Sequence, residues 1–527
     1  MMGNKKLKVW LPLMFSVVMI AGMFLGYDLG GGSNFFKTDK KTSLQEAVEI
    51  IRSKYVDNVN LDSLQGGAIQ EMMSQLDPHS VYFPPVELKA ADEELRGNFD
   101  GIGVEFNVFD DTVNIVYVIP DGPSDKAGLQ IGDKLIKAND SLLTLKNIST
   151  DQIKSYIRGE RNSKVVLQIM RDGQLKTITV TRGNIPVPSI DAAYMIDKTT
   201  GYIKLNKFTA TSYPEFMQAI ENLKEQGLKQ LIFDLRGNGG GFMDDAINIA
   251  DEFLDGDKLV VYTQGVNSPK REFRCKRPGL LEDGKLILLV DELSASASEV
   301  LSGALQDWDR ATIIGRRTFG KGLVQEQYDL SDGSAIRLTV ARYYTPLGRS
   351  IQRPYDKGKK VYMDEIWERY ANGEALYADS NKITNGRQFK TNKGKIVYGG
   401  GGIMPDIFVP ADTSSYPVGV NRLLGDGSFN SFVYRYYLQH RSQVDGYASA
   451  TDYTSHFNHL DELWSQFVNY VTKDSVDLTV VSPKQKESLQ KRLEAYLARF
   501  KWRNYGFYQV LNTDDPVVIK ALEELKK

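Results

Sequence analysis

An apolar run at residues 286–290, LILLV, leads within a few residues into the hexapeptide SASASE at 294–299. Beyond the hexapeptide, Val300, Leu301 and Ala304 recur at helical spacing. The segment therefore predicts a buried strand that turns into a helix. A serine at the start of that helix would lie beside unpaired backbone N–H groups and the positive end of the helix dipole, which favour an oxyanion. Spacing alone does not choose among the three serines.

Strands and helices alternate over the surrounding sequence as well. Residues 201–205, 231–235 and 311–315 predict strands, a helix is expected to end at Gly227, and another is expected over 243–254. This alternation predicts an α/β core, with ligand chemistry at the carboxyl ends of the strands.

A glycine-rich loop, RGNGGG at 236–241, follows one of these strands directly. A phosphate-binding loop would continue with Gly-Lys-Ser/Thr, which is missing here. We interpret the segment as an oxyanion loop, in which glycine lets a backbone N–H approach a substrate carbonyl.

A lysine stands between two glycines in FGKG at 319–322, 25 residues after the middle serine of the hexapeptide (321 − 296). A hydroxyl nucleophile needs a base, and none of the four histidines is near the serines or the glycine loop in sequence. Burial lowers the pKa of a lysine, so that lysine can act as the base. The working hypothesis is a serine nucleophile activated by Lys321.

A separate β-rich module is predicted from 97 to 183. It begins with GIGVEF at 101–106 and carries AGL at 127–129 and GD at 132–133, and in these residues it resembles a PDZ domain. Backbone N–H groups in the segment Gly101, Ile102, Gly103 and Val104 would hold a terminal carboxylate, while the strand edge pairs with the peptide. The alternative is that the two glycines only form a tight turn.

The core motifs together resemble the carboxyl-terminal processing peptidases, also called tail-specific proteases. The resemblance covers residues 97–350 and 402–406, and the matching motifs are DLRGNGGG, SASASE, GRRTFGKG followed by Val324 and Gln325, and YTPLGR. The resemblance implies that Ser296 is the nucleophile, Lys321 the general base and Gln325 the residue that orients the lysine. It also implies oxyanion-hole N–H donors at Ala297 and Gly241.

The resemblance implies a multidomain α/β protein with a crotonase/ClpP-like serine protease core and an inserted PDZ module. Apolar residues at helical spacing predict helical N- and C-terminal regions on either side. We predict a tail at 1–8, an anchor or signal segment at 9–27, a linker at 28–42, a helical region at 43–96, the PDZ domain at 97–183, the core at 184–412 with a charged surface insertion near 353–397, and a helical region at 413–527. For the insertion and the C-terminal region, gating, oligomerisation and docking of a partner or adaptor all stay open.

The N-terminus predicts a membrane segment. Lys5, Lys6 and Lys8 precede an uncharged run at 9–27, which is long enough to span a bilayer with its N-terminus in the cytoplasm. The body is then expected outside the cytoplasm, on the periplasmic side of the inner membrane. A retained anchor is favoured over a cleaved signal because no clear cleavage site follows.

Composition excludes several classes of function. The net charge of −2 gives no electrostatic reason to expect nucleic acid, and the single cysteine, Cys275, excludes an internal disulfide. We expect no metal or other cofactor: His456 and His459 have a spacing compatible with a metal, but no carboxylate pattern accompanies them. His79 is expected to have a loop or capping role, with catalysis as the alternative.

The function expected from these features is that of a serine endopeptidase that engages protein C-terminal tails through its PDZ domain and cleaves them in the cell envelope. The alternative is a non-catalytic scaffold with a protease-like core. A trypsin-like PDZ protease does not fit, because it would need a histidine and an aspartate before the serine and a PDZ domain after it.

Overall fold

The computed structural model describes residues 5–29, 42–377, 386–412, 416–473 and 476–527. It divides into two compact units, residues 1–72 and 73–527.

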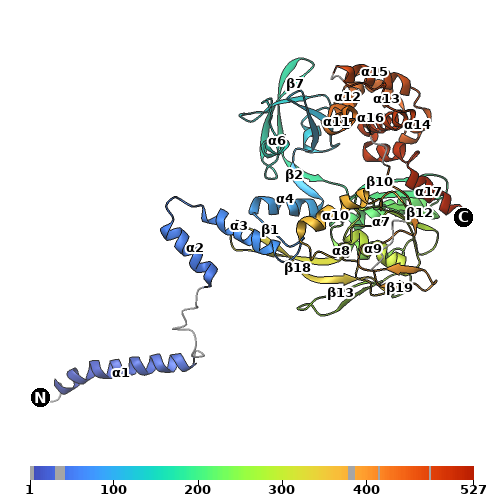
Figure 1. Ribbon diagram of the computed structural model, residues 1–527. Coiled ribbons are helices and arrows are strands. Elements are labelled where there is room, and N and C mark those ends of the chain that lie inside the picture. Colours follow the sequence, from blue (N-terminus) through green and yellow to red (C-terminus); the bar gives the residue numbers. More distant parts are fainter. Residues whose placement is uncertain (1–4, 30–41, 378–385, 413–415, 474–475) are drawn as a thin grey trace. The chain divides into compact units, whose positions relative to one another are not determined.

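The first unit is helical, with α1 (Lys5–Leu29), α2 (Ser43–Lys54) and most of α3 (Leu61–Ser74) (Figure 1). A capping box between Thr42 and Gln45 begins α2. The predicted membrane segment 9–27 lies within α1, but the side chains of its two end residues are outside the described ones. Among the described residues, no helix is both long and apolar enough to cross a membrane. Most of the predicted tail and linker, at 1–4 and 30–41, lies outside the described residues.

The predicted core, residues 184–412, is built on a six-stranded sheet in the order β10-β11-β12-β15-β16-β21. Its strands are β10 (Ile190–Met195), β11 (Thr200–Leu205), β12 (Gln230–Asp234), β15 (Leu286–Val290), β16 (Thr312–Gly315) and β21 (Ile407–Phe408). Every pair except β10 with β11 is parallel. The predicted α/β core is therefore confirmed, and the glycine loop and the serines both follow the carboxyl ends of neighbouring strands.

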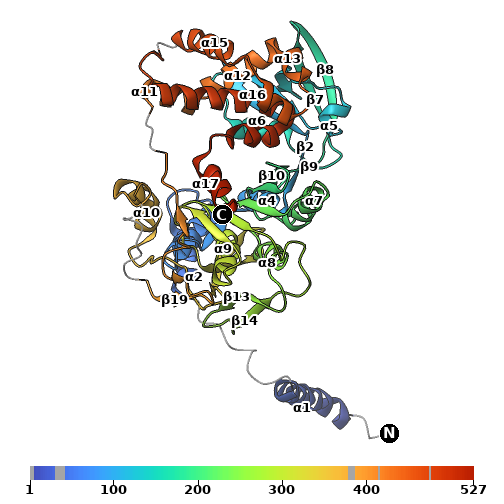
Figure 2. The same ribbon diagram turned by 90° about the vertical axis from the view of Figure 1, so that its right-hand side faces the viewer.

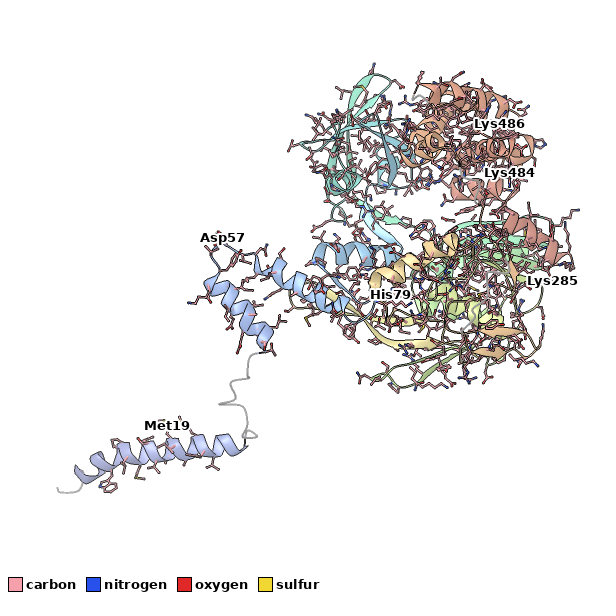
Figure 3. All side chains as sticks on the ribbon, in the orientation of Figure 1. Met19, Asp57, His79, Lys285, Lys484 and Lys486 are labelled. Atoms are coloured by element: carbon pink, nitrogen blue, oxygen red, sulfur yellow. The ribbon has the colours of Figure 1, made fainter. Side chains whose placement is uncertain are left out.

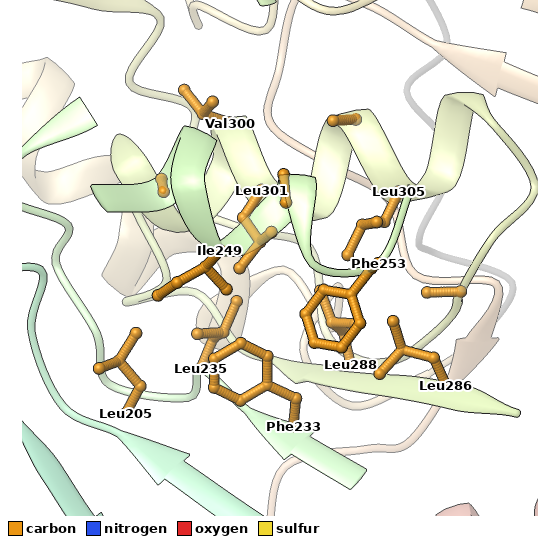
Figure 4. Packing of buried hydrophobic residues seen from close by; sticks show 14 of the residues in the cluster. Leu205, Phe233, Leu235, Ile249, Phe253, Leu286, Leu288, Val300, Leu301 and Leu305 are labelled. Carbon is orange, nitrogen blue, oxygen red and sulfur yellow. The ribbon is translucent and has the colours of Figure 1, made fainter. Parts of the chain in front are cut away.

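Both faces of this sheet are covered, which explains why β15 is wholly apolar and why β12 is apolar between its two end residues. Helices α7 (Ser212–Glu225), α8 (Met243–Asp251) and α9 (Ala297–Asp307) pack on the face that carries Phe233 and Leu288, as Figure 4 shows for α8 and α9. The opposite face, with Ile232 and Ile287, packs against α17 (Pro516–Leu525) (Figure 2). The alternation follows from the two-residue period of a strand.

A second sheet of the core is antiparallel. It consists of β1 (Val81–Phe83), β18 (Ala335–Tyr344), β13 (Leu259–Gln264), β14 (Arg271–Arg274) and β17 (Leu323–Asp329), which pairs with β18. Helix α4 (Pro85–Arg96) follows β1. The lysine loop leads directly into β17, so that Gln325 is held on a strand.

The module after α4 has the predicted β-rich structure. Strands β2 (Asn98–Gly101) and β9 (Gly183–Pro186) pair at its base. A second sheet contains β3 (Val104–Phe109), β4 (Thr112–Val118), β5 (Lys134–Ala138), β6 (Ser141–Leu142), β7 (Lys164–Arg171) and β8 (Gln174–Thr181), with helices α5 (Pro123–Lys126) and α6 (Thr150–Ile157). Because the order is β3-β4-β5-β7-β8, β3 is an edge strand.

The C-terminal region is helical, as predicted. Its helices are α11 (Val418–Gly425), α12 (Ser428–Gln439), α13 (Arg441–Gly446), α14 (Ala450–His456), α15 (Leu460–Thr472), α16 (Pro483–Leu511) and α17. They form their own apolar cluster, except that α17 belongs to the core sheet, where Lys285 Nζ also donates to the carbonyl of Leu525 at 2.9 Å.

The charged segment 353–397, expected to be a surface excursion, is in part buried. It contains α10 (Lys359–Ala371) and the hairpin β19 (Gln388–Lys390) with β20 (Ile396–Tyr398). Arg353 and Arg369 are buried and both pair with Glu365. Charge in the sequence was a poor guide to exposure here because opposite charges neutralise one another inside the segment.

Candidate active site

One cavity of about 480 Å³ brings the predicted site residues of the core together. It is lined by Gly241, Ser296, Ala297, Lys321 and Gln325. These residues come from the loop after β12, the start of α9 and the lysine loop with β17, so segments more than 80 residues apart in sequence meet here (325 − 241 = 84).

The three serines of the hexapeptide differ in their surroundings. Ser294 and Ser298 are fully buried, and their hydroxyls donate to the carbonyls of Leu235 and Asn238, at 2.8 and 2.9 Å. Ser296 is only partly buried, and among the described residues its hydroxyl donates no hydrogen bond. It is the serine of the three that faces the cavity.

Ser296 has an unusual backbone conformation, with φ 55° and ψ −112°. A non-glycine residue with positive φ is uncommon and is held there by its surroundings. The carbonyl of Ser296 accepts a hydrogen bond from the hydroxyl of Tyr343 at 3.1 Å. The strained turn presents the side chain at the start of α9.

Two backbone N–H groups at the cavity make no hydrogen bond within the described part of the chain. Among the described residues, neither the N–H of Ala297 nor that of Gly241 has a hydrogen-bond partner, although Gly240 N–H donates to Asn238 Oδ1. The loop passes very close to Phe208: a Cβ on Gly241 would lie 1.9 Å from the carbonyl oxygen of Phe208. Only glycine fits at this position.

Lys321 lies against the same cavity and is largely buried. Burial, and next the positive charge of Arg337, lower the pKa of Lys321 from 10.5 to about 8. Its Nζ donates to Gln325 Oε1 at 2.8 Å, and its carbonyl accepts from Tyr343 at 2.7 Å. In the described residues no hydrogen bond joins Nζ to the hydroxyl of Ser296, and such bonds are often looser before substrate binds.

The backbone carbonyl of His79 holds the side chain of Gln325 in place. The carbonyl of His79, labelled in Figure 3, accepts a hydrogen bond from the Nε2 of Gln325. The imidazole packs against Phe319 and contacts the hydroxyl of Tyr362 at 2.9 Å. Burial and the charge of Lys321 lower the pKa of His79 to about 3, so the ring is neutral at ordinary pH. This favours the predicted loop role over catalysis.

Glu299 is a central residue that the sequence reasoning missed. It is fully buried and accepts hydrogen bonds from the backbone N–H groups of Ser296, Gly320 and Lys321, at 2.9, 2.7 and 2.9 Å, and from the hydroxyl of Thr318. One carboxyl group therefore joins the serine turn to the lysine loop. The signal was present: Ser296 and Glu299 have the i, i+3 spacing of a capping box.

The PDZ segment has free N–H groups at the end of the edge strand. The carbonyls of Ile102 and Gly103 accept bonds from Ser124 and Ile119, but among the described residues their own N–H groups have no partner. Gly103 has φ +75°, which suits glycine. Gly101 closes the pairing of β2 with β9, and Val104 begins β3.

Helix α4 connects the two sites. Asp92, Leu95 and Arg96 line the cavity of Ser296. From the same helix, Glu93 pairs with Arg158, which follows α6 of the PDZ domain, at 3.4 Å.

Other candidate residues lie elsewhere. Cys275 is buried, and burial raises the pKa of its thiol to about 12. His456 pairs with Asp452 and His459 with Glu462. The described residues contain no group of His, Cys, Asp and Glu side chains that could hold a metal ion.

Comparison with known families divides the chain in a similar way. Residues 199–358 match peptidase family S41, residues 101–181 match the PDZ domain, and residues 32–85 match the N-terminal domain of the activating protease CtpB. Residues 420–503 match a family of unknown function.

Individual relatives agree with these matches. The carboxy-terminal processing protease CtpA of Bacillus subtilis is 31% identical over 396 residues, which cover 74% of this chain and 83% of the relative. A probable CtpA-like serine protease of Staphylococcus epidermidis is 32% identical over 357 residues, covering 66% of this chain and 72% of the relative. A solved photosystem II D1 C-terminal processing protease is 25% identical, with a TM-score of 0.35, covering 72% of this chain and 89% of that chain. The similarity to the Bacillus subtilis relative, together with the match to peptidase family S41, shows that the chain belongs to the carboxy-terminal processing serine proteases of that family.

Proposed function

We propose that this protease cleaves peptide bonds with Ser296 as nucleophile and Lys321 as general base. The observation that carries the proposal is the cavity itself, in which the one accessible serine of the hexapeptide lies with a buried lysine whose pKa is lowered to about 8. A lysine with that pKa is partly neutral near pH 8 and can accept a proton.

In this mechanism the proton of the Ser296 hydroxyl passes through Lys321 to the leaving amine. Lys321 takes the proton of the Ser296 hydroxyl as the oxygen attacks the substrate carbonyl, and the ammonium then gives a proton to the leaving amine. Gln325, held by the carbonyl of His79, orients the lysine Nζ through its Oε1. Water then hydrolyses the acyl-enzyme, with the lysine again as base.

The free N–H groups of Ala297 and Gly241 would stabilise the oxyanion. Donors that are already in place when charge develops need no reorganisation, and losing one such donor typically costs roughly 100- to 1,000-fold in kcat. Both groups lack a partner among the described residues, which supports this assignment.

The PDZ domain would capture the C-terminal tail of a protein substrate. The tail would add to the free edge of β3, with its carboxylate at the N–H groups of the segment from Gly101 to Val104. The free N–H groups of Ile102 and Gly103 support this. The comparisons give no support to the alternative of a non-catalytic scaffold.

The site of action that we propose is the cell envelope. The basic flank and the uncharged run at 9–27 support a membrane anchor with the protease on the periplasmic side. Fractionation of cells with an antibody to the core checks this, and recovery of the full-length chain in the cytoplasmic fraction would contradict it.

Cleavage of an unstructured peptide with an apolar, free C-terminus tests the catalytic assignment. Wild type is compared with Ser296→Ala and Lys321→Ala by mass spectrometry of the products. Both substitutions are expected to abolish cleavage while the proteins still bind the peptide. Ser302→Ala, a buried serine of the same helix α9 whose hydroxyl only donates to the carbonyl of Ser298, is the matched control and is expected to retain activity.

Two outcomes would contradict the proposal. Cleavage by Ser296→Ala at the wild-type rate excludes that residue as nucleophile. A wild-type protein that binds such peptides and leaves all of them intact would favour the scaffold.

A further inference from the structure

In the protease core, the guanidinium of almost every buried or partly buried arginine pairs with a carboxylate or donates to backbone carbonyls. Within the described residues of 184–412, eight arginines are buried or partly buried, at 236, 310, 316, 317, 337, 349, 353 and 369. Six of them pair with carboxylates, and Arg310 donates to four backbone carbonyls. This is expected, because a desolvated charge without a partner is costly.

Arg337 is the exception. It lies on β18, partly buried, with its guanidinium 4.7 Å above the ring of Phe83. Among the described residues, its one hydrogen bond runs from Nη2 to Gln327 Oε1, at 3.0 Å, and it has no carboxylate partner. The remaining N–H donors of the guanidinium are unused.

The Arg337 guanidinium, which has no direct ion pair among the described residues, lies in the catalytic cavity. Arg337 lines the same cavity as Ser296 and Lys321. The cavity has an apolar side, formed by Leu95, Phe242, Met243, Val300, Leu323 and Val324. Its acidic lining residue is Asp92, which pairs with Arg96 at 3.4 Å. The charges of Asp92 and Glu94 raise the pKa of Arg337, but burial outweighs them and lowers it, and neither carboxylate forms an ion pair with Arg337 among the described residues. An anionic group that enters the cavity can therefore accept hydrogen bonds from the N–H donors of Arg337 that make no bond within the described residues.

We propose that Arg337 is a specificity residue that binds a carboxylate of the substrate close to the scissile bond. A planar guanidinium matches a carboxylate with two parallel hydrogen bonds. Because Arg337 and Ser296 share one cavity of about 480 Å³, the carboxylate lies within roughly three residues of the bond that is cut, at about 3.3 Å per extended residue. The proposal rests on the function proposed above for this cavity.

The carboxylate has two sources, an Asp or Glu side chain or the free C-terminus of the chain. The PDZ domain also binds a free C-terminus in the proposed function, so the two effects must be separated. A preference that arises at Arg337 disappears when Arg337 is changed, whereas one that arises at the PDZ domain remains.

The experiment compares full-length wild type, Arg337→Gln and Arg337→Lys on matched peptides. One arm exchanges Asp and Glu for Asn and Gln at each position around the mapped cleavage site. The other arm exchanges the free C-terminus for an amide. The measured quantity is the ratio of kcat/KM for the acidic and the neutral peptide within each protein. A change in the pKa of Lys321 affects both peptides, so it cancels in this ratio.

Wild type is expected to prefer the acidic peptide by about 10- to 100-fold at one position, the range for a hydrogen bond to a charged group. Arg337→Gln should bring the ratio close to one, and Arg337→Lys should retain part of it. Arg342→Gln, an exposed arginine of the same strand outside the cavity, is the control and should behave as wild type.

An equal preference in wild type and Arg337→Gln would overturn the proposal, and so would equal cleavage of both peptides by wild type. The Ser296→Ala protein, with and without Arg337→Gln, supplies a second readout by calorimetric binding of the acidic and neutral peptides. An acid preference that depends on Arg337 in binding, without any cleavage by wild type, would refute the catalytic assignment but not the carboxylate site.

Discussion

The three serines of the hexapeptide, which the sequence pattern could not tell apart, differ in burial and in the hydrogen bonds of their hydroxyls. Ser294 and Ser298 are buried and their hydroxyls donate to backbone carbonyls, so neither is free to react. The hydroxyl of Ser296 donates no hydrogen bond among the described residues, and Ser296 lines the cavity. Resemblance to the family had pointed to Ser296, and burial is an independent physical reason for the same choice.

The glycine loop is expected to tolerate no side chain at position 241. Gly241→Val should lower kcat by roughly 100- to 1,000-fold, because displacing the loop removes an oxyanion donor. A Cβ there would lie 1.9 Å from the carbonyl oxygen of Phe208, so the melting temperature should fall as well. Gly237→Ala is the matched control: its φ is +70°, which causes similar backbone strain, but a Cβ meets nothing within 4 Å. Near-normal turnover of Gly241→Val would refute the assignment.

The lowered pKa of Lys321 predicts the pH dependence of activity. With a pKa of about 8, the neutral base is lost as pH falls, so kcat/KM should drop about tenfold per pH unit below pH 8 and level off above it. A flat profile from pH 5 to 9 with chemistry rate-limiting would count against a lysine base.

The same pKa shift predicts a stability effect of opposite sign to that of a salt-bridged lysine. The pKa of Lys321 is about 8 in the folded protein, below the ordinary 10.5 of an unfolded chain. Below pH 8 the buried lysine is charged and lowers the free energy of unfolding by the full amount. This destabilisation decreases as pH rises from 8 toward 10.5, because the lysine then loses its charge in the folded protein. Lys321→Met should therefore be more stable than wild type at pH 7, by about 1–3 kcal/mol, and the difference should shrink at pH 10. Chemical denaturation at the two pH values measures this.

At the scale of elements, the start of α9 and the lysine loop are joined by Glu299. Glu299→Gln replaces an acceptor of four hydrogen bonds by an amide whose NH₂ group would face N–H donors. A shift of the serine turn against the lysine loop is expected, and misplacement of about 1 Å can cost about 100-fold in kcat. The effect should fall on kcat more than on KM.

A second buried carboxyl group separates this effect from simple destabilisation. Glu292→Gln disturbs the pair of Glu292 with Arg316, at 2.7 Å, and lies outside the cavity. It should lower the melting temperature and leave kcat near the wild-type value. Equal loss of kcat in both variants would mean that Glu299 has only a structural role.

Helices and strands were predicted correctly where the apolar periodicity was strong. The prediction failed for the segment 353–397, where a high content of charged residues was assumed to mean exposure to solvent. The four strands β11, β12, β15 and β16 of the core sheet were predicted because apolar runs are local signals, whereas β10 and β21 were not predicted. The segment 353–397 was expected on the surface, yet Arg353 and Arg369 are buried with Glu365. Pairing between charges is a tertiary property, so composition could not reveal it.

At the scale of the whole chain, α16 contacts both the PDZ domain and the core. Arg503 interrupts the helix with φ 55° and ψ −151°, a conformation that costs a non-glycine residue about 1–3 kcal/mol. Its guanidinium pairs with Glu105 of β3 and lies 3.5 Å from the ring centre of Tyr117. The next residue, Asn504, donates to Asp191 of the core at 2.6 Å.

Removal of the charge on Glu105 is expected to loosen this contact. Arg499 and Arg503 both pair with Glu105, at partly exposed positions, so Glu105→Gln should lower the free energy of unfolding by about 1–2 kcal/mol. Amide hydrogen exchange should rise in β3, β4 and around Arg503. Glu160→Gln, an exposed residue of the same domain, is the control. Unchanged exchange in Glu105→Gln would show that the apolar contacts suffice.

Local pattern was enough to predict the α/β core, a β-rich module, the helical C-terminal region and the serine turn followed by a lysine, because periodicity and glycine placement act over a few residues. Resemblance to a family was needed to identify the β-rich module as a PDZ domain. Four features depended on contacts between distant segments: the burial that separates Ser296 from its neighbours, the desolvation of Lys321, the role of Glu299 and the lack of a carboxylate partner for Arg337. Each is a matter of what surrounds a polar group once the chain has folded. Hydration and charge pairing are set by that environment and leave little trace in the order of the residues.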